Sequence, residues 1–163
     1  MHFPTHIEAA RWLIASAVAL ALGAASVNDI LVRKIPNWTV VAVIALFGAW
    51  AISTPSVSLL SSFAASAIIF AITSTLFALG IVGGGDSKLM TAVALFAGFG
   101  QLPDFVFLTA LAGGAMAVAS LASQPMRTFV MLTAPSTAAS TRGIPYGVAI
   151  SLSGIALLVR QLL

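Results

Sequence analysis

Acidic side chains are the main candidates for chemistry in this sequence. Cysteine is absent, and the two histidines, His2 and His6, both lie near the N-terminus. The chain therefore has no thiol nucleophile and no disulfide, and two histidines alone give no metal cluster. We expect neither a metal nor a cofactor. Carboxyl groups in a pair can act as general acid and general base. The chain has four acids: Glu8, Asp29, Asp86 and Asp104.

Two of these acids lie where a helix must end or begin. Asp29 is followed by a segment in which Pro36 cannot continue a helix and Asn37 is a suitable N-terminal cap for the next one. Asp86 follows three consecutive glycines at 83–85, which allow another backbone to approach closely because they have no side chains. We therefore expect Asp29 and Asp86 to meet at one edge of the fold.

Each acid also has a purely structural interpretation. Asp86 could cap its own helix, because acids favour helix N-termini, and Asp29 could pair with Arg33, four residues further on. Asp104 directly follows Pro103 and is predicted to cap the N-terminus of a helix. The spacing alone leaves these alternatives open for Asp29 and Asp86.

Membrane helices must position these acids, because the composition is that of an integral membrane protein. Of the 163 residues, 60% are apolar and 7% are charged, whereas about 25% of a soluble domain is charged. This excludes a soluble enzyme and a nucleic-acid-binding protein, and it indicates an all-α, polytopic helix bundle in a lipid bilayer. Uncharged stretches of about 20 residues mark the crossings. They predict one domain, 1–163, with six helices at about 10–28, 38–53, 58–81, 86–101, 104–122 and 145–161.

The basic residues predict how the bundle is oriented. With an even number of crossings, both termini lie on one side and the first, third and fifth loops lie on the other. Those three loops carry five cations: Arg33, Lys34, Lys88, Arg127 and Arg142. The side of the termini carries Arg11 and Arg160. The positive-inside rule then predicts cytoplasmic loops and acids, with both termini outside. The alternative of a cleavable signal peptide in the first segment would leave an odd number of crossings.

Other features also suggest a membrane boundary. Trp12, Trp38 and Trp50 each fall near a predicted helix end, where tryptophan commonly anchors a protein at the interface. The segment 123–143 is rich in Ser, Thr, Pro and Ala, and it is predicted to be a long loop. It could be a tether or a segment that faces a substrate.

Three segments, in order along the chain, resemble the prepilin peptidase family. Residues 83–86 fit the G-x-G-D motif of intramembrane aspartyl proteases, and the continuation to Leu89 matches G-x-G-D-x-K-L of the prepilin peptidases. Asp29 with the I-P-N of 35–37 resembles the first-aspartate motif of that family, and 144–150 resemble its P-Y-G-x-A-I segment. The resemblance is to the short, single-domain branch that is associated with Flp-type, tight-adherence pili.

The resemblance implies an aspartic-type endopeptidase of the bacterial inner membrane that removes the leader peptide of a type IV prepilin at the cytoplasmic face. Asp29 and Asp86 would be catalytic, one ionised to take a proton from water and one protonated to polarise the scissile carbonyl. From the helix ends, Asp86 is predicted to be the anion and Asp29 the neutral acid. Longer members of the family carry paired Cys-x-x-Cys motifs and also methylate the pilin. Without cysteine, methyl transfer is not expected here. The expected partners are the prepilin precursor and the lipid bilayer, and no nucleic acid.

Further residues are predicted to support the site: Gly83, Gly85, Lys88, Pro36, Asn37 and Tyr146. Lys88 could orient the acids or read acidic groups of the substrate, or it could simply lie at the cytoplasmic interface. Tyr146 could hydrogen-bond into the site or be an ordinary interfacial tyrosine. The residues alone leave both alternatives open.

Other functions also fit parts of the pattern. An archaeal-type preflagellin peptidase shares the G-x-G-D motif. A small ion-coupled transporter could also place carboxylates next to glycine-broken membrane helices. A structural assembly subunit could carry the same acids without needing them. The I-P-N and P-Y-G-x-A-I segments favour the prepilin peptidases.

Overall fold

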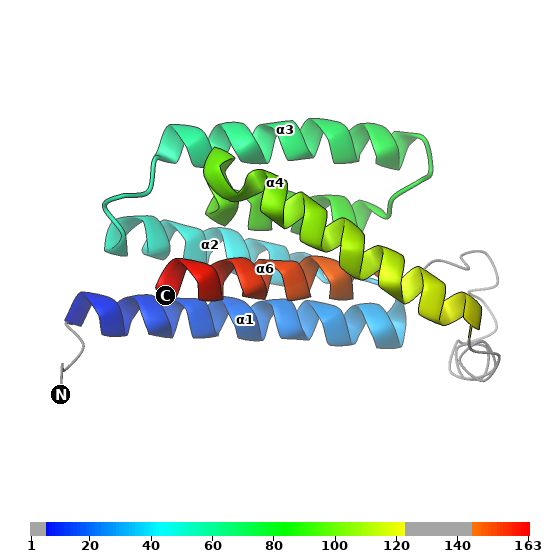
Figure 1. The fold of residues 1–163 in the computed structure, drawn as a ribbon, viewed down its shortest axis with the longest axis horizontal. Helices are drawn as coiled ribbons and strands as arrows, with labels where there is room; N and C mark the ends of the chain where they lie inside the picture. Colours follow the sequence, from blue (N-terminus) through cyan, green and yellow to red (C-terminus); the bar gives the residue numbers. More distant parts are fainter. Residues whose placement is uncertain (1–5, 123–144) are drawn as a thin grey trace.

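The computed structural model describes residues 6–122 and 145–163, which form helices joined by short loops (Figure 1). No strand occurs within these two ranges, so the predicted all-α fold is confirmed. The helices are α1 (His6–Val32), α2 (Asn37–Ser53), α3 (Leu59–Ala78), α4 (Gly84–Ala122) and α6 (Tyr146–Leu162).

The helices pack as one bundle in which α6 lies between α1 and α4. Helix α1 contacts α2 and α6, and α4 contacts α2, α3 and α6. In Figure 1, α6 runs alongside α1, and the start of α1 lies at the same end as the end of α6. The opposite end therefore collects the end of α1 and the starts of α2, α4 and α6. This is the end where the sequence predicts the paired acids.

Helix α4 is broken at Gly98, whose φ of 51° and ψ of −172° are not helical. Its two arms, 84–97 and 99–122, correspond to the fourth and fifth predicted helices, but the break lies earlier than the predicted gap between 101 and 104. Pro103 lies near the start of the second arm, where its missing N–H costs at most one helical hydrogen bond. The N–H of Phe99 donates instead to Ser61 Oγ at 2.8 Å, so a side chain from α3 satisfies the start of this arm.

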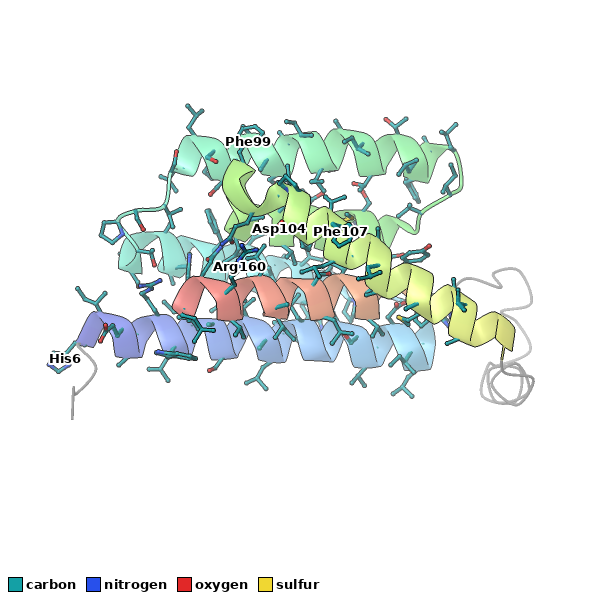
Figure 2. All side chains as sticks on the ribbon, viewed as in Figure 1. His6, Phe99, Asp104, Phe107 and Arg160 are labelled. Carbon is teal, nitrogen blue, oxygen red and sulfur yellow. The ribbon has the colours of Figure 1, made fainter. Side chains whose placement is uncertain are left out.

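Asp104 is not an N-terminal cap, contrary to the prediction from sequence. It lies inside the second arm of α4, because the helix has already begun after Gly98. Its Oδ2 accepts a hydrogen bond from Arg160 near the end of α6, and Figure 2 shows the two side chains next to each other. Both side chains are exposed, so this ion pair adds little to stability.

The outer surface of the bundle suits lipid. Three segments are long and apolar enough to cross a membrane, namely α1, α3 and Gly84–Ala119 of α4. Helices α2 and α6 have 17 residues each, close to the minimum of about 17 for a crossing. Large apolar side chains point outward, and Leu20, Ile52 and Leu60 are 77%, 85% and 82% exposed. Soluble proteins rarely expose so extensive an apolar surface. Together with the candidate spans, this surface shows that the protein is a membrane protein.

The three tryptophans have two different environments. Trp12 and Trp38 are exposed, as interface anchors should be. Trp50 is only 1% exposed, packs beside the ring of Phe96, and lies under the guanidinium of Arg11. The prediction that Trp50 anchors the protein at the interface is therefore wrong. Its position near a helix end did not reveal which face of the helix it occupies.

Hydroxyl side chains connect the helices inside the bundle. Ser151 Oγ of α6 donates to the backbone oxygen of Leu22 in α1 at 3.0 Å. Thr109 of α4 and Ser153 of α6 share a hydrogen bond of 2.7 Å. Small polar residues of this kind allow close helix contact in a medium where apolar burial gives little driving force.

Gly98→Ala is expected to destabilise the bundle. A side chain is strained at this positive φ, and the added Cβ would lie 3.1 Å from Ser61 Oγ. The expected loss is about 1–3 kcal/mol, measured as a lower unfolding midpoint when the full chain in mild detergent is titrated with dodecyl sulfate. Gly100→Ala is the matched control, because a Cβ there meets open space and alanine favours a helix. Equal destabilisation of both variants would contradict this explanation of the break.

Candidate active site

Asp29 lies in the last turn of α1 and is 7% exposed. Its Oδ2 accepts a hydrogen bond of 2.8 Å from the backbone N–H of Gly147, the second residue of α6. N–H groups at the start of a helix have no partner within that helix. This bond therefore satisfies both groups and ties the end of α1 to the start of α6.

Asp86 lies in the first turn of α4, and the backbone N–H of Gly83 hydrogen-bonds to its carboxylate. An acid at this position commonly reaches back to the N–H before its helix, so the predicted capping role is real. Asp86 Oδ1 is buried and has no hydrogen-bond partner within the described residues. Asp29 is close enough for its charge to act on Asp86. The fold therefore brings together two acids that are far apart in the sequence.

Two glycines permit this arrangement because a side chain would overlap the acids. A Cβ on Gly147 would lie 2.8 Å from Asp29 Oδ2. A Cβ on Gly83 would lie 2.8 Å from Asp86 Oδ2. Cβ atoms essentially never approach other atoms so closely, so any other residue would shift the carboxylate or the helix.

The loop between α1 and α2 packs against the start of α4. Arg33 has a φ of 57° and its N–H donates to the backbone oxygen of Asp29 at 3.1 Å, so α1 ends at Val32, within one turn of the acid. A Cβ on Gly85 would lie 3.0 Å from the Cβ of Ile35. Pro36, in extended conformation, then precedes α2. The glycine segment and the I-P-N segment are thus in direct contact.

Asn37 does not cap α2, contrary to the prediction from sequence. Pro36 takes the capping position and Asn37 is the first helical residue. The turn is closed by Thr39, whose Oγ1 donates to the backbone oxygen of Pro36 at 2.7 Å. Asn37 Oδ1 is therefore available to accept a hydrogen bond of 3.2 Å from Lys88 Nζ. Lys88, two residues after Asp86, joins the start of α4 to the start of α2.

Tyr146, the first residue of α6, packs against the second arm of α4. A Cβ on Gly113 would lie 2.8 Å from Tyr146 Cε1. The tyrosine is 42% exposed, and its hydroxyl makes no hydrogen bond in the part of the chain that the structure describes. Of the two alternatives for Tyr146, this geometry favours the interfacial one.

Sequence reasoning missed two contributions to the site. Ser87 Oγ donates to Thr73 Oγ1 at 2.8 Å, and this buried bond holds the turn that carries Asp86 against α3. Polar residues within apolar helices were the available signal for this pair. Gly147 lies in the P-Y-G-x-A-I segment, but that motif did not reveal its N–H as a donor, because almost every residue has a backbone donor and only helix contacts decide which one is used.

A family model described as the type IV leader peptidase family matches residues 16–118, more than half of the chain. The matched region contains both acids, the I-P-N loop and the glycine segment, and it ends before Gly147. Comparisons with curated proteins and with solved structures gave no match. The helical membrane fold and the family match together define a membrane peptidase. The chain belongs to the type IV leader peptidase family, which confirms the resemblance that the motifs suggested.

Gly147→Ala is expected to lower peptidase activity by about 10²-fold in a protein that still folds. The added methyl group would displace the Asp29 carboxylate or the start of α6. Cleavage of a prepilin by the purified, reconstituted chain measures the effect. Gly114→Ala is the control, since a Cβ there meets open space, and it should keep full activity. Wild-type activity in the Gly147→Ala variant would show that the close contact with Asp29 is unnecessary.

Proposed function

We propose that the protein is an aspartic-type endopeptidase that removes the leader peptide of type IV, Flp-type prepilins, with Asp29 and Asp86 as its catalytic residues. The observation that carries the proposal is the pair itself. Two carboxyl groups from separate helices lie near each other at one end of a membrane bundle, in a chain of the type IV leader peptidase family. Acids at a membrane edge are unfavourable and usually serve a function.

Hydrolysis by such a pair needs one ionised and one protonated carboxyl group. The carboxylate takes a proton from water as the water oxygen attacks the scissile carbonyl carbon. The carboxylic acid gives its proton to the carbonyl oxygen, which forms a tetrahedral intermediate. When the intermediate collapses, one of its hydroxyl protons returns to the carboxyl group that had given its proton, the carbonyl re-forms and the C–N bond breaks. The leaving amine takes the proton that the other carboxyl group had removed from water. Two close carboxyl groups retain one proton between them because a second negative charge is unfavourable.

The position of the shared proton stays a prediction. Asp86 lies at the positive N-terminal end of α4, which favours the anion. Asp29 lies at the negative end of α1, which was the reason to expect it to be neutral. It also accepts the N–H of Gly147 at the positive end of α6, and the charge of Arg33 acts on it. Helix ends therefore do not distinguish the two acids.

We further propose that the paired acids face the cytoplasm from the bacterial inner membrane, which the chain crosses several times, with both termini outside. Arg33, Lys34 and Lys88 lie at the end of the bundle that holds the acids. Arg127 and Arg142, which the sequence assigns to the same side, lie outside the described residues. The positive-inside rule supports this orientation.

The proposed activity is leader removal without methyl transfer. The chain contains no cysteine, so it cannot form the paired Cys-x-x-Cys motifs that the longer members of the family carry. The segment 123–143, which could face the substrate, lies outside the described residues. The proposed partners are a prepilin precursor, whose scissile bond must reach the paired acids, and the surrounding lipid.

Asp29→Asn and Asp86→Asn are each expected to lower cleavage by about 10²–10⁴-fold, because asparagine keeps the size of the side chain and removes its ionisable group. The full chain is co-expressed with a Flp-type prepilin, and the pilin mass reports removal of the leader. Asp104→Asn is the matched control. It alters an exposed ion pair with Arg160, which contributes little to stability, and it should leave the pilin fully processed.

Other outcomes would select the other functions. Unchanged pilin mass with the wild-type chain, together with ion flux that either asparagine variant abolishes, would favour an ion-coupled transporter. Cleavage of an archaeal preflagellin but of no prepilin would favour that related peptidase. Full processing by the Asp29→Asn or Asp86→Asn variant would rule out the proposed catalytic pair.

A further inference from the structure

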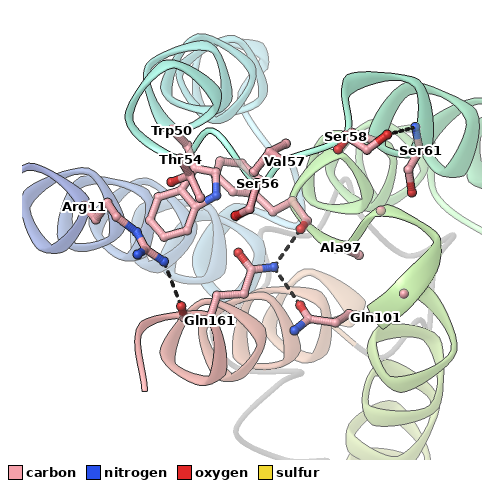
Figure 3. Close-up of a pocket in the computed structure, with 14 residues that line it drawn as sticks. Arg11, Trp50, Thr54, Ser56, Val57, Ser58, Ser61, Ala97, Gln101 and Gln161 are labelled. Atoms are coloured by element: carbon pink, nitrogen blue, oxygen red, sulfur yellow. Dashed lines mark hydrogen bonds between the residues drawn. The ribbon is translucent and has the colours of Figure 1, made fainter. Parts of the chain in front are cut away.

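A polar cavity of about 300 Å³ lies at the end of the bundle opposite the two acids. It forms where α1, the end of α2, the start of α3, the break in α4 and the end of α6 meet (Figure 3). Sites for small molecules have volumes of about 300–1,000 Å³, so the cavity has room for a small polar group. The residues that carry the argument are Arg11, Trp50, Thr54, Gln101 and Gln161.

Arg11 is the one charged residue among the described residues that line the cavity. Its Nη2 donates to the backbone oxygen of Gln161 at 2.9 Å, and its guanidinium lies 5.3 Å from the centre of the Trp50 ring. The indole is buried and therefore fixes the cation in place. Glu8 and Asp104, the acids of this end, do not line the cavity. The site is therefore positively charged.

Three hydrogen-bond acceptors beside the cavity already have donors, whereas two buried polar atoms remain unpaired. Gln161 Nε2 donates to the backbone oxygen of Phe96 at 2.7 Å and to Gln101 Oε1 at 2.6 Å, as the dashed lines in Figure 3 show. Arg11 Nε and Thr54 Oγ1 are buried and have no partner within residues 6–122 and 145–163. Buried donors without partners are unfavourable. A ligand with anionic oxygens would satisfy both if these side chains turned to present them to the cavity.

The surroundings of the cavity are apolar and exposed. Ile52, two residues before Thr54, is 85% exposed, Leu60 at the start of α3 is 82% exposed, and Phe99 is 49% exposed. Ile52 and Leu60 lie at helix ends, where a membrane helix approaches the lipid head groups, and Phe99 lies at the break in α4. A ligand with both a phosphate and acyl chains fits the polar cavity and the apolar surface beside it.

We propose that this cavity binds the phosphate of a phospholipid head group. Arg11 and Thr54 donate hydrogen bonds to the phosphate oxygens, and the acyl chains lie along the exposed apolar residues nearby. The lipid would join the start of α1 to the ends of α2 and α6, at a site separate from the paired acids. In the proposed orientation this site faces the outer leaflet, but the lipid site itself does not depend on the proposed peptidase mechanism.

The test is native mass spectrometry of the full chain in detergent, titrated with dioleoylphosphatidylglycerol. The wild-type chain should retain one lipid in a saturable manner. Arg11→Gln should weaken this binding by about tenfold, the loss of one charge-assisted hydrogen bond. Thr54→Val should weaken it by about fivefold. Because Thr54 Oγ1 has no partner in the described protein, this variant loses no internal hydrogen bond and should fold normally.

Matched controls separate the cavity from general effects. Arg160→Gln removes a cation from the same end outside the cavity, and Thr75→Val removes an exposed hydroxyl from the far end of α3. Both should bind the lipid as the wild-type chain does. Equal lipid binding by the Thr54→Val variant and the wild-type chain would overturn the proposal.

Two further ligands test which part of the lipid is recognised. Dioleoylglycerol, which lacks the phosphate, should not compete for the site, and equally tight binding of it would overturn phosphate recognition. Inorganic phosphate at millimolar concentration should not displace the lipid. The lipid assignment would be wrong if inorganic phosphate displaced the lipid, bound as tightly as the lipid does, and bound more weakly to the Thr54→Val variant. The cavity would then be a site for a free oxyanion.

Discussion

The hydrogen bond of 2.8 Å from the N–H of Gly147 to Asp29 requires the start of α6 to touch the end of α1 with no side chain between them. Gly85 and Ile35 impose the same requirement where α4 meets the loop after α1. A carboxylate in low-polarity surroundings is unfavourable unless donors compensate it. Backbone N–H groups at two helix starts supply those donors, one for each acid. The positions of α1, α4 and α6 at this end follow from that need.

The two ends of the bundle differ because their connections differ. At the end with the acids, short loops and glycines bring three helix termini close together, and Lys88 reaches across to Asn37. At the other end, the break at Gly98 turns the second arm of α4 away, and this leaves a cavity beside the buried Trp50. Between the ends, a core of buried apolar side chains joins the helices, and hydroxyl groups add hydrogen bonds between α1, α4 and α6. The proposed peptidase site and the proposed lipid site therefore lie at opposite ends of the bundle.

Composition and uncharged stretches were enough to predict a helical membrane bundle, and the ordered motifs indicated the family. Finer features depended on contacts between distant residues. Pro103 suggested where α4 would break, but proline is tolerated near the start of a helix. The break instead lies at Gly98, which has a positive φ and lies beside Ser61. Asparagine is a common N-terminal cap, yet the side chain of Asn37 instead accepts a hydrogen bond from Lys88. The two acids could be singled out because their side chains carry the motifs. The P-Y-G-x-A-I segment contains Gly147, but it did not show that the N–H of this glycine would hold Asp29.

The proximity of Asp29 and Asp86 is tested most directly by crosslinking. The chain contains no cysteine, so the double variant Asp29→Cys with Asp86→Cys has only two thiols. A protease site inserted in the loop between α2 and α3 allows a link within one chain to be detected, since the linked fragments stay together after cleavage. We predict that a short bismaleimide links this pair in native membranes and does not link Asp29→Cys with Asp104→Cys, at the opposite end. Absence of the first link, with both thiols reactive towards a monofunctional maleimide, would contradict a shared site.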